Sequence, residues 1–314
     1  MLILDLNNSK TFLDTTEKLR KGLKNRQPNY LHVSKINLKN MLKLFDQVLR
    51  SKYIISMSPS PLNIPICIIS KILNKKFFVG LHDIIPHEGK KRNRTRIYNF
   101  LLTKFAYKII LFSLFSYKQA KKYYKLRENK LLRINLALPN YPEILNLERR
   151  YDFALIGRLD KYKGVEEFIE LAKKFPNYSF LLAGELIMDD KIENLQNVDK
   201  FLFRLEFSKY IELISSTKIL ILPYKSATQS GVLLDALFTK TFVIARDVGA
   251  MKEQLETYRN GVLYNDFSEL IDFIKNIENF SDFKITENEL NSAIKKIEEQ
   301  DIFLLQDFEK SLLS

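Results

Sequence analysis

The chain has 314 residues, of which 46% are hydrophobic, so it is long enough for about two domains with buried cores. Its single cysteine, Cys67, excludes an internal disulfide and a cysteine-rich zinc site, and it indicates a reducing compartment. The start, MLILDLNNSK, lacks the basic and apolar segments of a signal peptide, and no run of about 18 uncharged apolar residues follows. We therefore expect no membrane span.

The net charge of +13 is divided unevenly along the chain. Residues 1–150 carry 30 Lys and Arg against 9 Asp and Glu, whereas residues 151–314 carry 20 against 28. The densest basic stretches are GKKRNRTR (89–96) and KQAKKYYKLRENK (118–130). Zinc-finger, RNP-like and basic-leucine patterns are absent, so we expect an anionic membrane surface as partner and no nucleic acid. The alternative is a lysine-rich solvated surface without a ligand.

In the first half, short apolar runs alternate with amphipathic segments. The predicted strands are 2–6, 30–33, 53–57, 77–81, 109–113 and 131–134, and the predicted helices are 10–24, 38–50, 62–73, 93–105 and 116–125. Buried apolar strands that alternate with helices are typical of a parallel sheet with helices on both faces.

A linker, LALPNYPEILNLERR (136–150), precedes a second series of the same kind. Its predicted strands are 151–157, 178–184, 198–203, 218–223, 241–245 and 261–264, and a long helical tail follows at 287–313. The pattern predicts an α/β chain of two doubly wound, Rossmann-like domains, 1–140 and 141–290. A C-terminal helix, 291–314, is expected to pack back toward the first domain. Ligands of such sheets bind outside the carboxyl ends of the strands, so we expect a site in a central cleft between the domains.

The second domain opens with FALIGRLDKYKGVEEF (153–168). A strand ends near Gly157, and Arg158 and Lys163 occupy the loop that leads through Gly164 into a helix. Cations beside a strand end and a helix N-terminus favour an anion, because Arg forks onto phosphate oxygens and Lys adds a point charge. The alternative is a turn with surface cations.

A later segment, YKSATQSGVLLDALF (224–238), places small polar residues between a strand and an apolar helix. Free backbone N–H groups at residues 226–231, and the positive end of the helix that begins near Ser230, would form a second phosphate cradle. Asp235 lies within the first two turns, where it could accept hydrogen bonds from sugar hydroxyls. Alternatively, Ser230 caps a core helix and has no further role.

Taken together, GRLDKYKG and PYKSATQSGVLLDAL…VIARDVGAMKEQL resemble the nucleotide-sugar domain of GT-B glycosyltransferases, specifically of glycosyltransferase family 4. The resemblance implies that Arg158 and Lys163 bind the donor diphosphate and that Asp235, in place of a family Glu, binds the ribose. The other family Glu, which contacts the donor sugar, falls on Ala227. This matches a branch with an ATQSGV loop, in which the expected donor-binding residues also include Gly157, Thr228, Gln229, Ser230 and Gly231.

In the first domain, GLHDIIPHEGKKRN (80–93) resembles an HD-x-x-PH-x-GE loop of some bacterial family members. The loop contains His82, Asp83, His87 and Glu88 and follows a predicted strand. Such residues can orient acceptor hydroxyls or act as a base, so we expect them on the acceptor side. The alternative is a polar loop without a ligand.

These features predict a metal-independent glycosyltransferase of hexosyl type, and the family resemblance implies that it retains the anomeric configuration. It would need no cofactor and would move a sugar from a nucleoside-diphosphate sugar to a glycan or polyprenyl-linked acceptor. The predicted catalytic residues are His82, Asp83, Arg158 and Lys163. The predicted setting is capsule, O-antigen or exopolysaccharide synthesis, with the protein in the cytoplasm and peripherally bound to the inner face of the membrane. The alternative is a non-catalytic GT-B protein that binds a glycan or a partner enzyme.

Overall fold

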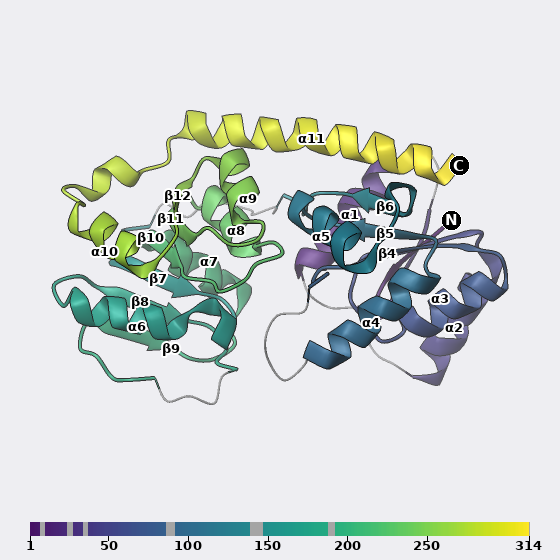
Figure 1. The fold of residues 1–314 in the computed structure, drawn as a ribbon, viewed down its shortest axis with the longest axis horizontal. Helices are drawn as coiled ribbons and strands as arrows, with labels where there is room; N and C mark the ends of the chain where they lie inside the picture. Colours follow the sequence, from purple (N-terminus) through teal and green to yellow (C-terminus); the bar gives the residue numbers. More distant parts are fainter. Residues whose placement is uncertain are drawn as a thin grey trace. The chain divides into compact units, whose positions relative to one another are not determined.

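The computed structural model describes residues 1–6, 10–23, 28–33, 37–85, 92–138, 147–187 and 192–313. The chain divides into two compact units (Figure 1). Unit 1 consists of Met1–Leu138 together with Glu298–Ser314, and unit 2 consists of Pro139–Ile297.

Unit 1 contains a six-stranded parallel sheet in the order β2-β1-β3-β4-β5-β6. Its strands are β1 Leu2–Asp5, β2 Asn29–His32, β3 Tyr53–Ser56, β4 Lys76–Gly80, β5 Lys108–Leu111 and β6 Leu131–Arg133. Most central-strand residues are fully buried, as expected where helices cover both faces of a parallel sheet.

The helices of unit 1 are α1 Lys10–Gly22, α2 Leu38–Arg50, α3 Asn63–Ile72, α4 Arg92–Phe105, α5 Leu114–Tyr124, the short 3-10 turn η2 Glu128–Lys130 and the last part of α11 Glu287–Leu313. One apolar cluster joins the sheet to α2, α3, α4 and α5 through residues such as Leu44, Cys67, Leu102 and Ala120. On the opposite face, Phe308 of α11 contacts Phe78 with ring centroids 5.6 Å apart. In Figure 1, α2, α3 and α4 lie on the other side of the sheet from this end of α11.

Unit 2 contains a second parallel sheet, in the order β12-β11-β10-β7-β8-β9. Its strands are β7 Tyr151–Ile156, β8 Phe180–Ala183, β9 Val198–Phe201, β10 Thr217–Leu222, β11 Phe242–Arg246 and β12 Gly261–Tyr264. Its helices are α6 Val165–Lys174, α7 Phe207–Ser215, α8 Gly231–Phe238, α9 Met251–Tyr258 and α10 Phe267–Lys275, with the 3-10 turns η3 Lys161–Lys163 and η4 Phe280–Phe283. Figure 1 shows α6 on one face of this sheet, and α7, α8 and α9 together on the other.

The prediction of an α/β chain with two doubly wound, Rossmann-like domains is confirmed. Each predicted strand forms with ends within two residues of the expected ones. The main differences are at termini. For example, α5 begins at Leu114, before the predicted 116, because the hydroxyl of Ser113 accepts a hydrogen bond from the backbone N–H of Ser116 and caps the helix.

Candidate functional site

The strand order of unit 2 reverses between the neighbouring strands β7 and β10. The chain moves through β8 and β9 on one side of β7, and through β11 and β12 on the far side of β10. Such a reversal is the switch point at which doubly wound sheets bind their ligands, outside the carboxyl ends of the strands. The two segments singled out in the sequence, 157–164 and 223–231, leave the sheet at these two strand ends.

Backbone contacts join these two loops directly. The N–H of Lys225 donates to the carbonyl oxygen of Tyr162 at 2.7 Å. Gly164 has a φ of +74°, and a Cβ at this position would lie 2.0 Å from the carbonyl oxygen of Pro223. Only glycine allows this approach, so the KG pair of the sequence motif serves to bring the two loops together.

The two predicted phosphate-binding cations have different surroundings. The ammonium of Lys163 lies 3.5 Å from the ring centroid of Tyr224, a fully buried side chain, and this cation–π contact fixes its direction. Arg158 is exposed, and its guanidinium makes no hydrogen bond or ion pair with the described residues. The strand before it ends at Gly157, whose φ is +125°. The loop therefore holds the ammonium of Lys163 in a fixed direction, whereas the guanidinium of Arg158 is exposed to a possible anion.

The loop from Ala227 to Ser230 is held by α9 and the turn before it. The side-chain amide of Gln254 forms a matched pair with Ser230, accepting from its N–H at 2.8 Å and donating to its carbonyl at 3.1 Å. The carbonyl of Ala227 accepts from the N–H of Ala250 at 3.0 Å. Thr228 and Ser230 are buried and Gln229 is half-buried. This loop is therefore a fixed part of unit 2.

Helix α8 begins directly after this loop. Ser230 occupies the N-cap position, as the alternative predicted, but its side chain makes no capping hydrogen bond. The prediction of a free backbone N–H is wrong at Ser230, because this N–H donates to the side chain of Gln254. A Cβ added to Gly231 would meet no atom within 4 Å, which means that the space beside the first turn of α8 is open. An open helix N-terminus favours an anionic group, because its N–H groups and dipole point there.

Asp235 lies one turn further along α8 and is half-buried. Its Oδ2 accepts a hydrogen bond from the hydroxyl of Tyr210 on α7 at 2.6 Å. The carboxylate is therefore oriented by a neighbouring helix, as a residue that positions a ligand would need to be.

Sequence reasoning missed Tyr210, Tyr224 and Gln254 as parts of this site. Tyr224 and Gln254 stand within the quoted motif PYKSATQSGVLLDAL…VIARDVGAMKEQL, which marked their segments but not the contacts that they make. Tyr210 stands in FSKYIELIS, an ordinary amphipathic segment whose pattern gives no sign of a partner 25 residues away.

In unit 1, His82 and Asp83 follow β4. The Nε2 of His82 lies 2.9 Å from the carbonyl oxygen of Met57, and its ring stacks on Phe112 with centroids 4.0 Å apart. Burial lowers the pKa of His82 to about 4, so the ring is neutral near pH 7. A carbonyl only accepts, so Nε2 carries the proton and Nδ1 is the acceptor nitrogen. Asp83 is exposed. His87 and Glu88 lie outside the described residues.

The switch point of unit 1, between β1 and β3, holds a buried polar network. The hydroxyl of Ser58 donates to Oδ1 of the fully buried Asp5 at 2.9 Å and accepts from the N–H of Leu6 at 3.0 Å. This network ties the chain after β3 to the chain after β1.

Over the ranges that the structure describes, no three His, Cys, Asp or Glu side chains come together as a metal site would require. Metal independence stays a prediction.

Comparison with known proteins agrees with this geometry. The family model described as glycosyl transferases group 1 matches residues 139–297, which are the bounds of unit 2. No curated protein has a sequence that matches the chain significantly.

Solved structures of the same fold include three with low sequence identity. Anabaena HepE in complex with UDP-glucose has a TM-score of 0.72 at 18% identity, over 99% of each chain. Sucrose-phosphate synthase from Thermosynechococcus elongatus has a TM-score of 0.70 at 14% identity, over 100% of this chain and 99% of that one. The UDP-forming α,α-trehalose-phosphate synthase from Burkholderia vietnamiensis has a TM-score of 0.62 at 10% identity, over 99% of each chain.

The paired Rossmann-like sheets are those of the GT-B fold. With the family model matching half of its length, this chain belongs to the glycosyl transferases group 1 family.

Proposed function

We propose that this protein is a retaining glycosyltransferase that moves a sugar from a nucleoside-diphosphate sugar to a glycan or lipid-linked glycan in bacterial surface polysaccharide synthesis. The observation that carries the proposal is the junction at the switch point of unit 2. There, two loops in backbone contact bring Arg158, Lys163 and the open N-terminus of α8 to the ends of two adjacent strands.

The physical task of such a site is to stabilise the leaving group. As the bond between sugar and diphosphate breaks, negative charge grows on the diphosphate oxygens. Donors fixed in advance lower the barrier, because they do not reorganise during the reaction. Lys163 and the N–H groups at the start of α8 fit that task, and the exposed Arg158 adds a second positive charge beside them. We assign no metal or cofactor to the reaction.

Asp235 is proposed to accept hydrogen bonds from the ribose hydroxyls of the donor, with Tyr210 holding the carboxylate in place. The sugar itself must be held without an acid at residue 227. The side chain of Ala227 is buried, and its carbonyl oxygen is engaged by the N–H of Ala250. We therefore assign the sugar contacts to Gly157 and to the neighbouring Thr228, Gln229 and Ser230.

His82 and Asp83 are proposed to act on the acceptor. A neutral His82 whose Nε2 proton is directed at Met57 leaves Nδ1 as the nitrogen that can accept from a hydroxyl. A pKa of about 4 makes this imidazole a weak base, so we assign it to orienting the acceptor hydroxyl. Asp83, which follows His82 in the same loop and is exposed, is proposed to accept the proton of the acceptor hydroxyl.

Membrane association is proposed from charge. Residues 1–150 carry a large excess of Lys and Arg, which suits a lipid-linked acceptor at an anionic surface. In the part of the chain that the structure describes, none of the helices is long and apolar enough to cross a membrane.

A non-catalytic GT-B protein that binds a glycan or a partner enzyme is the second candidate, favoured by Ala227 in place of an acid. A panel of nucleotide sugars distinguishes the two. We expect one donor to raise the melting temperature and to be hydrolysed slowly without acceptor, with free sugar detected by mass spectrometry. Stabilisation without hydrolysis or transfer to any acceptor would favour the non-catalytic protein. No stabilisation by any donor would contradict both the site and the proposal.

A further inference from the structure

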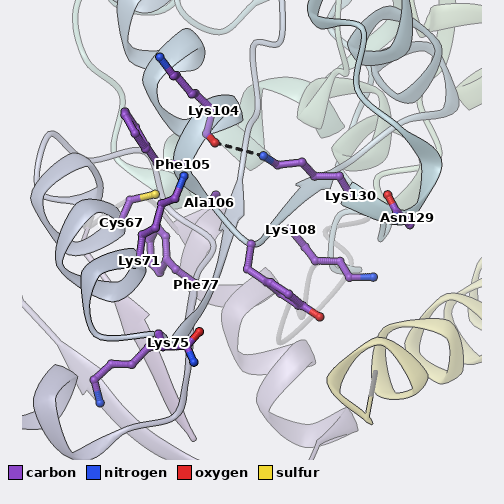
Figure 2. Close-up of a pocket in the computed structure, with 12 residues that line it drawn as sticks. Cys67, Lys71, Lys75, Phe77, Lys104, Phe105, Ala106, Lys108, Asn129 and Lys130 are labelled. Carbon is purple, nitrogen blue, oxygen red and sulfur yellow. Dashed lines mark hydrogen bonds between the residues drawn. The ribbon is translucent and has the colours of Figure 1, made fainter.

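A pocket of about 550 Å³ lies in unit 1 at the amino ends of β4 and β5 (Figure 2). Its walls come from the ends of α3 and α4 and from the turn before β6. The loop with His82 and Asp83 follows the carboxyl end of β4, so the pocket lies at the other edge of this sheet. It is therefore separate from the acceptor-side residues.

The pocket is lined by five lysines and no carboxylate among the described residues: Lys71, Lys75, Lys104, Lys108 and Lys130. None of the five forms an ion pair with a carboxylate in the described part of the chain. Burial raises the pKa of Cys67, at the base of the pocket, to about 12, so the thiol stays neutral and supplies no counter-charge. The wall of the pocket therefore carries several positive charges that no described carboxylate neutralises, although the ammonium of Lys75 is turned to the carbonyl oxygens of Leu49 and Ser51.

Contacts within the pocket hold several of these ammonium groups in place. The ammonium nitrogens of Lys71 and Lys104 lie 5.1 and 5.6 Å, respectively, from the ring centroid of Phe105. Lys130 donates to the carbonyl oxygen of Lys104 at 3.3 Å, as Figure 2 shows. Burial, with the nearby charge of Lys71, lowers the pKa of Lys130. A bound anion would raise this pKa again, since opposite charge favours the ammonium form.

Phosphate is the anion that suits this pocket. Lysine is a compact point charge with three donors, and several lysines together can meet the several oxygens of a phosphate group. The side-chain amides of Asn74 and Asn129, which also line the pocket, add uncharged donors.

The surface beside the pocket is apolar. Ile72 at the end of α3 is 76% exposed, and Phe100 on α4 is 55% exposed, with the ammonium of Lys104 6.0 Å from its ring centroid. Lys75 donates to the carbonyl of Leu49, which ends a stripe on α2 that is exposed at Leu38, Leu42, Phe45 and Leu49. These four follow helical spacing, so they share one face. Exposed apolar side chains of this density mark an interaction surface.

The positive charge of α2, α3 and α4 indicates that the partner of this surface is anionic. The ranges of α2, α3 and α4 contain one carboxylate, Asp46, and it is paired with Arg50 at 2.7 Å. Lysines and arginines beside exposed Leu, Ile and Phe are the composition of a surface that lies in the headgroup layer of an anionic membrane.

We propose that the lysine pocket binds the phosphate of an anionic phospholipid while the apolar residues of α2, α3 and α4 lie in the lipid interface. The proposal deepens the membrane association proposed above and gives it a defined binding site. A free phosphorylated compound offers the same oxygens but gives the apolar surface nothing to contact.

The test is sedimentation with vesicles of phosphatidylcholine alone, or with about one fifth phosphatidylglycerol, at low salt. The pocket variant is Lys71→Gln/Lys108→Gln/Lys130→Gln. The control, Lys118→Gln/Lys122→Gln/Lys125→Gln, removes the same charge from exposed lysines on and after α5. We expect binding only to the anionic vesicles, a loss of roughly 10²-fold in the pocket variant, and a much smaller loss in the control.

Equal losses in the two variants would overturn the proposal, since they would indicate diffuse charge attraction.

A second variant, Ile72→Ser/Phe100→Ser, leaves the lysines intact and is expected to weaken vesicle binding roughly tenfold, on the scale of the apolar area removed. If it instead shifts the oligomeric state and leaves vesicle binding unchanged, the surface pairs two copies of the chain and the proposal fails.

Inorganic phosphate and glycerol phosphate are tested as soluble competitors of vesicle binding. We expect neither to compete with vesicles at millimolar concentration; competition would assign the pocket to a free phosphorylated ligand. Nucleotide binding by each variant is measured alongside. Vesicle binding without nucleotide binding would remove the glycosyltransferase proposal and leave the lipid site, and the reverse result would remove only the lipid site.

Discussion

The hydroxyl of Tyr210 lies 2.6 Å from Oδ2 of Asp235, so a side chain of α7 orients the carboxylate that α8 carries. A carboxylate has about four acceptor positions, so this hydrogen bond leaves the group able to accept from a ligand. The pair holds the carboxylate of α8 in one orientation, as its proposed contact with the ribose requires.

Tyr210→Phe is expected to weaken binding of the nucleoside diphosphate by roughly tenfold, the scale of one hydrogen bond to a charged group. The matched control is Tyr151→Phe, which removes a similar bond, 2.9 Å to Asp199, at an exposed position of unit 2. Calorimetric titration of both variants checks the prediction. Equal affinities would contradict the role of Asp235.

Arg158→Ala is expected to lower turnover by roughly 10²-fold, because one donor to the leaving diphosphate is lost. The melting temperature should not change, since the guanidinium contacts none of the described residues. Arg150→Ala serves as the control: Arg150 is an exposed arginine just before the amino end of β7, where no ligand is expected. Near-normal turnover of the Arg158 variant, measured with saturating donor, would contradict the diphosphate assignment.

Of two glycine substitutions, one should lower nucleotide affinity and the other should lower thermal stability. Gly231→Ala adds a methyl group that meets no protein atom within 4 Å, so the protein should remain as stable. Nucleotide affinity should fall roughly tenfold or more, because the methyl group takes space that the ligand would fill. Gly249→Ala places a Cβ 1.7 Å from the carbonyl oxygen of Ala227 at a φ of +61°, so thermal stability should fall sharply. Thermal melts and titrations check both. Unchanged affinity in the Gly231 variant would show that no ligand approaches α8.

The stability of the protein is expected to depend on the protonation of His82. Burial lowers the pKa of His82 to about 4 from an ordinary 6.5, so between these pH values the unfolded chain binds the proton and the folded chain does not. The free energy of unfolding should therefore fall as the pH drops through this window. Between about pH 7 and pH 5, His82 should account for a loss of up to about 2 kcal/mol.

The variant His82→Gln should lack this part of the acid destabilisation, because glutamine does not titrate. Urea unfolding of the wild type and the variant at the two pH values gives the difference. A parallel fall in both proteins would contradict the buried, neutral state of the ring.

The sheets could be predicted from sequence because their strands are short apolar runs between amphipathic segments. That pattern predicted every strand and the doubly wound fold class. It did not predict the exact first and last residues of the helices and strands. The start of α5 depends on the hydroxyl of Ser113, and such caps are set by one local hydrogen bond.

The two loops at the switch point of unit 2 were predictable because Arg158, Lys163 and the 226–231 segment are contiguous motifs that follow strands. The residues that support them were not. Tyr210 reaches Asp235 from another helix, and Gln254 reaches Ser230 across 24 residues, so both depend on packing between elements. The lysine pocket also escaped prediction, because its five lysines come from separate segments that the sheet brings together.

The central claim is that a nucleoside diphosphate binds at the switch point of unit 2. Hydrogen exchange, with and without the nucleoside diphosphate that stabilises the protein most, tests this claim most directly. We predict slower exchange of backbone amides in 157–164 and 226–232, the two segments that we propose to contact the diphosphate. Unchanged exchange in both segments, or protection confined to other parts of the chain, would contradict it.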